Sequence, residues 1–133
     1  MSGKIEFQAE ILVADHDETL RELLEAPLRQ AHHNVRLAEN GQTALDLIRN
    51  EVFDLAIIDQ SLPDMSALEI LSRLKKSGDE IPHTMVLSSD STPEAIMECV
   101  EAGARDFVVK PFNLSVLIKR IGVILKRMGI DRA

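Results

Sequence analysis

Four stretches of the sequence end in side chains that can act on a charged group. Asp15 and Asp59 supply carboxylates, Ser88 a hydroxyl and Lys110 an amine. An aspartate is a poor nucleophile unless a cation draws charge off the group that it attacks and holds the reactants in line. Acids, a hydroxyl and a lysine are side chains from which such a polar reaction site can be built. The sequence has no glycine-rich phosphate loop and no Gly-x-Ser-x-Gly motif that would favour another chemistry.

The elements that must position these residues are short apolar runs alternating with amphipathic segments. Runs that are apolar throughout are typical of strands buried on both faces, as in a parallel sheet. Five such runs, each followed by a helical pattern, predict an α/β fold: a (βα)5 doubly wound, five-stranded parallel sheet with helices on both faces. The predicted strands are 11–14, 35–38, 55–59, 85–88 and 107–109, and the predicted helices lie around 20–28, 44–48, 68–74, from 92 onward, and 114–128.

This fold predicts where the chemistry lies. In doubly wound sheets the ligand site lies outside the carboxyl ends of the strands. Asp15 follows the first run, Asp59 ends the third, Ser88 ends the fourth and Lys110 follows the fifth. We therefore expect these four side chains to meet at one edge of the sheet.

Composition excludes several classes of function. The formal net charge of −7 disfavours binding to nucleic acid or to an anionic membrane. The aromatic fraction of 3% argues against stacking on single-stranded bases. With 133 residues the chain is expected to form one domain, and its single cysteine, Cys99, suits a reducing compartment. The sequence shows no signal peptide and no apolar run near the ~20 residues of a membrane span, so we expect a cytoplasmic protein.

The chain resembles the receiver domain of two-component response regulators. The resemblance spans about residues 8–128 and implies a single receiver domain over 1–133, with a flavodoxin-like fold. It also implies a role in a phosphorelay rather than as an enzyme. The segments that carry it, in the order and spacing of the family, are ILVADHDETLRELL, DLAIIDQSLPDMSALEIL, MVLSS and GARDFVVKPF.

The resemblance implies a role for each candidate residue. Asp59 would accept a phosphoryl group from a sensor histidine kinase or a phosphotransfer protein, and Lys110 would contact a phosphoryl oxygen. Mg²⁺ would be held by Asp15, Asp59 and the backbone carbonyl of Ser61. The hydroxyl of Ser88 and the ring of Phe107 would act as the switch residues, and the bond between Lys110 and Pro111 would be cis.

One departure from the family pattern falls within the metal site. His16 stands where the family has a second carboxylate. Mg²⁺ is a hard ion that prefers oxygen ligands in octahedral geometry, and a neutral imidazole suits it badly. His16 is therefore a doubtful metal ligand: it either weakens or abolishes Mg²⁺ binding, or is a solvent-facing bystander beside a working site. We do not expect Asp17 to replace the missing acid, because neighbouring residues at a strand end point in different directions.

Two other functions compete with phosphoryl acceptance. A pseudo-receiver would take no phosphoryl group and would act as a protein-docking module, a reading that His16 favours. A hydrolase resembling the haloacid dehalogenases would need a second aspartate two residues after the nucleophile, where this chain has Ser61.

A partner surface is expected on the fourth helix, the fifth strand and the fifth helix, for a homodimer or an output partner. Asp106 and Arg120 match charged positions that receivers of DNA-binding regulators use in pairing. Arg105 replaces a common acid there, so the charge pattern is incomplete.

Overall fold

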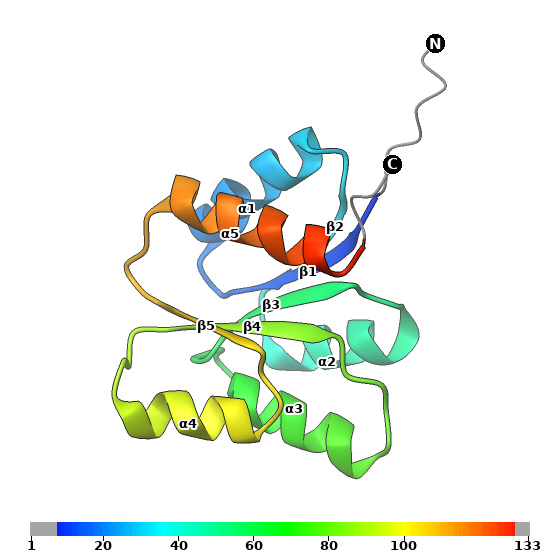
Figure 1. Cartoon of the computed structure of the whole chain (residues 1–133). Helices are drawn as coiled ribbons and strands as arrows, with labels where there is room; N and C mark the ends of the chain where they lie inside the picture. Colours follow the sequence, from blue (N-terminus) through cyan, green and yellow to red (C-terminus); the bar gives the residue numbers. More distant parts are fainter. Residues whose placement is uncertain (1–7, 130–133) are drawn as a thin grey trace.

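The computed structural model describes residues 8–129, which form alternating strands and helices (Figure 1). The strands are β1 (Glu10–Ala14), β2 (Asn34–Ala38), β3 (Leu55–Asp59), β4 (His83–Ser88) and β5 (Asp106–Val109). The helices are α1 (Glu18–Gln30), α2 (Gly41–Asn50), α3 (Ala67–Lys76), α4 (Pro93–Glu101) and α5 (Leu114–Arg127). Every predicted strand and helix is present, and the predicted α/β class is confirmed.

The strands form one parallel sheet in the order β2-β1-β3-β4-β5. The three central strands are almost fully buried, as their apolar sequences predict. The chain winds outward from β1 to β2 and then crosses back to β3, so the winding direction reverses between β1 and β3. A doubly wound sheet places its ligand crevice at such a reversal.

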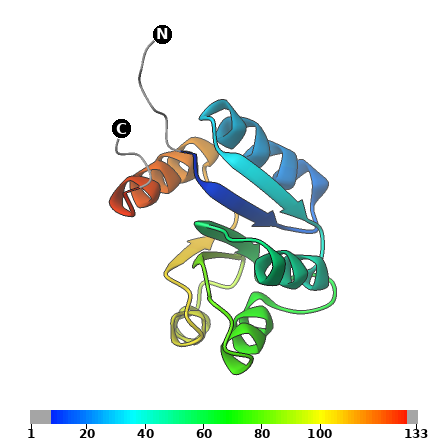
Figure 2. The same cartoon turned by 90° about the vertical axis from the view of Figure 1, so that its right-hand side faces the viewer.

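Alternate residues of the central strands pack into two separate hydrophobic cores, one on each side of the sheet. Ile11 and Val13 of β1 join the core under α1 and α5, whereas Leu12 and Ala14 join the core under α2, α3 and α4. The same alternation continues in β3 and β4, because successive side chains of a strand point to opposite faces. Figures 1 and 2 show α1 and α5 on one side of the sheet and the other three helices on the opposite side.

Each helix begins at a polar residue whose side chain accepts a backbone N–H of the first turn. The cap of α4, Thr92, accepts from Ala95, with Pro93 at the first helical position. The other capping residues are Asp17, Asn40, Ser66 and Asn113.

The predicted domain bounds of 1–133 extend beyond the described residues, and the structure does not test them. None of the helices within residues 8–129 has the length and apolar character needed to cross a bilayer.

Candidate functional site

The two candidate carboxylates lie side by side at the reversal point of the sheet. Asp15 directly follows β1, Asp59 ends the neighbouring β3, and both residues are buried. Backbone N–H groups hold each in place: Asp17 donates to Oδ1 of Asp15 (2.9 Å) and Ser61 donates to Oδ1 of Asp59 (3.2 Å). Two buried carboxylates this close need nearby cations, because a buried charge is costly unless it is paired.

Lys110 supplies one cation. It follows β5, and its Nζ lies 2.9 Å from Oδ2 of Asp15 and 3.4 Å from Oδ1 of Asp59. The backbone N–H of Lys110 donates to the carbonyl of Ser88 (2.8 Å), and the bond to Pro111 is cis, as predicted. Three strand ends thus converge on one pair of carboxylates.

Lys110 also has a shifted pKa. Its partial burial acts to lower the pKa, but the hydrogen bond to Asp15 and the charges of Asp15 and Asp59 outweigh burial and raise the pKa above its ordinary value. The ammonium is therefore the stable form at neutral pH.

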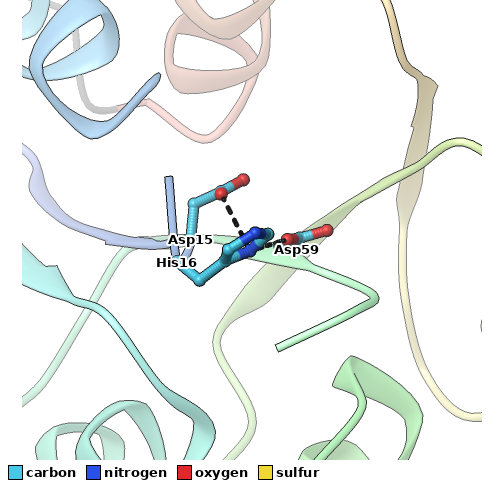
Figure 3. A group of neighbouring side chains, drawn as sticks. All are labelled: Asp15, His16 and Asp59. Carbon is cyan, nitrogen blue, oxygen red and sulfur yellow. Dashed lines mark hydrogen bonds and ion pairs between the residues drawn. The ribbon is translucent and has the colours of Figure 1, made fainter. Parts of the chain in front are cut away.

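His16 faces the same carboxylates. Its Nδ1 lies 3.3 Å from Oδ2 of Asp59 and 3.7 Å from Oδ1 of Asp15. Figure 3 shows the ring reaching toward both carboxylates, while 57% of the side chain remains exposed. Each aspartate thus directs one oxygen to Lys110 and the other to His16. The ring is thus both solvent-facing and in contact range of the site, and the effect of His16 on Mg²⁺ binding stays a prediction.

Asp17 serves a different purpose, as expected from its neighbouring position. Its carboxylate is the N-cap of α1 and accepts from the N–H groups of Thr19 (2.9 Å) and Leu20 (3.3 Å). This capping role is consistent with the expectation that Asp17 is not a ligand of the metal site.

The remaining predicted residues lie at the same end of the sheet or next to it. Ser88 is buried at the end of β4, where its Oγ accepts the N–H of Asp90 (3.0 Å). Phe107 of β5 is partly buried and packs against the core under α2, α3 and α4. Their switch roles, and the metal-ligand role of the Ser61 carbonyl, stay predictions.

Two contacts near the site were not predicted from the sequence. Arg21 of α1 donates from Nη1 to the carbonyl of Asp15 (2.7 Å), which ties the helix to the end of β1. Asp64, in the loop after β3, accepts the N–H groups of Gly41 (2.6 Å) and Gln42 (2.9 Å) at the start of α2. These N–H groups lower the pKa of Asp64. Neither contact has a local sequence signal, since each joins separate segments of the folded chain.

The sequence that forms this site matches a known protein family. A family model described as the response regulator receiver domain matches residues 11–122. The chain belongs to this family. Receiver domains are generally not enzymes, and they work in two-component systems with histidine kinases.

Individual relatives agree with this assignment. Response regulator MprA of Mycobacterium sp. (strain KMS) is 36% identical over 121 residues, which cover 91% of this chain and 52% of that protein. The MprA of Mycobacterium avium (strain 104) is 35% identical over 117 residues, covering 88% and 51%. The chain thus spans about half the length of these curated relatives.

Solved structures of receiver domains have the same fold. The receiver domain of the Francisella response regulator 1452 superposes with a TM-score of 0.82 at 26% identity and covers 91% of this chain and 99% of that one. A CheY-like receiver domain protein from Methanospirillum hungatei JF-1 gives a TM-score of 0.80 at 27% identity, with coverages of 90% and 95%. These neighbours confirm the predicted flavodoxin-like architecture.

Receiver domains typically bind Mg²⁺ in an acidic pocket, so the donor set here can be compared with that ion. Asp15, His16 and Asp59 each offer one ligand atom, and these atoms lie within 4.8 Å of one another. The two carboxylate oxygens suit Mg²⁺, but the imidazole nitrogen does not. The site therefore fits Mg²⁺ only in part.

Proposed function

We propose that Asp59 is the phosphoacceptor of a phosphorelay and takes its phosphoryl group from a sensor histidine kinase or a phosphotransfer protein. The observation that carries this proposal is the position of Lys110, whose ammonium lies 3.4 Å from Asp59 and 2.9 Å from Asp15. A cation held at the nucleophile can stabilise charge on the incoming phosphoryl group.

The transfer would exchange one bond to phosphorus for another. A carboxylate oxygen of Asp59 forms a bond to the phosphorus of a phosphohistidine as the P–N bond breaks. The donor imidazole then leaves with the electron pair of that bond. Lys110 can contact a phosphoryl oxygen. Ser88, at the adjacent strand end, can redirect its O–H from the carbonyl of Asp90 (3.5 Å) to another phosphoryl oxygen.

We also propose that Mg²⁺ binds weakly. A bound divalent cation would add positive charge at the phosphoryl oxygens. Here Asp15 and Asp59 are the acidic ligands, both are already paired with Lys110, and His16 offers nitrogen where an oxygen is preferred.

The contact between His16 and Asp59 favours a second function, that of a pseudo-receiver. Nδ1 of His16 lies 3.3 Å from Oδ2 of Asp59, so the ring engages the oxygen that Lys110 leaves open. If this contact keeps Asp59 from reacting, the chain is a pseudo-receiver that acts as a protein-docking module.

Intact mass spectrometry after incubation with acetyl phosphate, with and without Mg²⁺, distinguishes the two functions. The phosphorelay function predicts the addition of one phosphoryl group to the native chain and none to Asp59→Asn. The matched control is Asp46→Asn, an exposed aspartate of α2, which should be modified like the native chain. Full modification of Asp59→Asn would contradict the assignment. An unmodified native chain alongside a modified His16→Asp would contradict the phosphorelay and support the pseudo-receiver.

A further inference from the structure

The acidic pocket has two sides with different chemistry. Lys110 contacts Oδ2 of Asp15 and Oδ1 of Asp59, whereas Nδ1 of His16 faces Oδ1 of Asp15 and Oδ2 of Asp59. A metal ion attracted to the carboxylates would meet repulsion on the Lys110 side. It would therefore lie on the side where His16 is the third ligand.

The spacing of the ligand atoms on the His16 side is suitable for a metal ion. Nδ1 of His16 is 3.3 Å from Oδ2 of Asp59 and 3.7 Å from Oδ1 of Asp15. Ligands bound at about 2.0 Å in a tetrahedral site are separated by about 3.3 Å, and octahedral ligands by about 3.0 Å. All three ligand atoms lie within 4.8 Å of one another, so a bound ion would require small shifts of the two carboxylates as well as of the exposed ring.

The same side is open to water. A hollow of about 390 Å³ is lined by His16 together with Glu39, Asn40, Pro63 and Asp64. Because 57% of the His16 side chain is exposed, water has access to this side of the pocket and can complete the coordination of an ion held by three protein ligands.

The donor types determine which ion this site prefers. Mg²⁺ selects oxygen ligands and sheds its water reluctantly, whereas imidazole suits Zn²⁺, Co²⁺ and similar ions that also accept carboxylates. Because Lys110 already pairs with both aspartates, charge attraction for any dication is reduced. The nitrogen donor of His16 then has more weight in the choice of ion.

We propose that His16 shifts the preference of this pocket from Mg²⁺ to a divalent transition ion of the Co²⁺ or Zn²⁺ type, held by Asp15, His16 and Asp59. This inference deepens the proposed function, on whose site it rests, but it is tested without phosphorylation. Because transition ions also bind to carboxylates, the affinity for Co²⁺ alone does not reveal the contribution of His16. The informative quantity is the ratio of the Co²⁺ and Mg²⁺ affinities and its change between variants.

Isothermal titration calorimetry with Co²⁺ and Mg²⁺, together with the visible absorption spectrum of bound Co²⁺, tests the proposal. Relative to the native chain, His16→Asp should lower the ratio of Co²⁺ to Mg²⁺ affinity by at least about tenfold. The Co²⁺ absorption bands should also move as a nitrogen ligand is replaced by oxygen. His16→Asn separates donor type from charge, because it offers an amide oxygen without a negative charge. His16→Asn should also lower the ratio of Co²⁺ to Mg²⁺ affinity.

His32→Asn is the matched control for stray binding to surface imidazoles. His32 is exposed beyond the end of α1, and its φ of 70° is one that asparagine tolerates. This variant should keep the native ratio and the native Co²⁺ spectrum.

An affinity ratio that is the same in the native chain, His16→Asp and His16→Asn would overturn the proposal, as would a Co²⁺ spectrum that depends on His32. These outcomes are independent of phosphorylation. A pocket that prefers Co²⁺ but is never phosphorylated contradicts only the phosphorelay, and a phosphorylated Asp59 with an unchanged ratio contradicts only the metal preference.

Discussion

At the scale of single residues, the ammonium of Lys110 partly neutralises the negative charges of two buried carboxylates in the pocket. Asp15 is fully buried, and Lys110 shares its charge between Asp15 and Asp59. Its raised pKa shows that the charged form is stabilised in the folded chain despite partial burial. Lys110 therefore contributes to stability as well as to the proposed chemistry.

Lys110→Met should lower the free energy of unfolding by about 2 kcal/mol at neutral pH. This figure is below that for breaking a fully buried pair, because 24% of the Lys110 side chain is exposed to screening solvent. A raised pKa gives stabilisation that is complete below the unfolded pKa of about 10.4 and is lost as the pH rises through the higher folded value. Urea unfolding should thus show a difference between native and variant that is constant near neutrality and shrinks only above about pH 10.5. The control is Lys119→Met, which removes an exposed lysine. An equal loss of unfolding free energy in this variant would refute the claim that the pocket contacts of Lys110 stabilise the fold.

At the scale of elements, the sequence predicts strand and helix interiors better than their beginnings. β4 begins at His83 rather than Met85, because Thr84 and His83 continue the pairing with β3 although they break the apolar run. Likewise α2 begins at Gly41, before its apolar periodicity starts at Ala44. Convergence of the strand-end residues follows from topology and is predictable, whereas the contact between Asp64 and α2 depends on how a distant loop closes.

That loop contact makes Gly41 a position where a side chain does not fit. A Cβ there would lie 2.2 Å from Cγ of Met65 and 3.1 Å from Oδ1 of Asp64. Gly41→Ala should therefore destabilise the fold by about 1–3 kcal/mol, since a buried neighbour must move. Gly122→Ala, in α5, meets nothing within 4 Å and should stabilise by about 0.5–1 kcal/mol through helix propensity. Thermal unfolding of the native chain and both variants measures these two changes in stability. An unfolding temperature that Gly41→Ala leaves unchanged would show that the loop moves away from the added Cβ.

At the scale of the whole molecule, exposed apolar residues that neither core uses lie on the two helices and the strand at the β5 edge of the sheet, which together form the surface called this face below. Charged groups accompany them: Asp106 of β5 lies 3.3 Å from Nη2 of Arg120 in α5 and 2.5 Å from Nε2 of His83. This face corresponds to the predicted surface for a homodimer or output partner. Its exposed apolar side chains are Met97 and Val100 of α4, Val109 of β5, and Val116 and Val123 of α5.

A homodimer through this face should form when the pocket is loaded with a phosphoryl analogue such as beryllofluoride. Val116→Asp places a charge among the apolar side chains of α5, so it should keep the loaded chain monomeric by leaving that charge unpaired in the interface. Val52→Asp is the matched control, because Val52 is 77% exposed and lies between α2 and β3, outside this face. Sedimentation velocity should give a dimer for the loaded native chain and for Val52→Asp, and a monomer for Val116→Asp. A native chain that carries the analogue and still stays monomeric at high concentration would exclude the homodimer and leave the face to an output partner. Equal weakening by both substitutions would place the interface elsewhere.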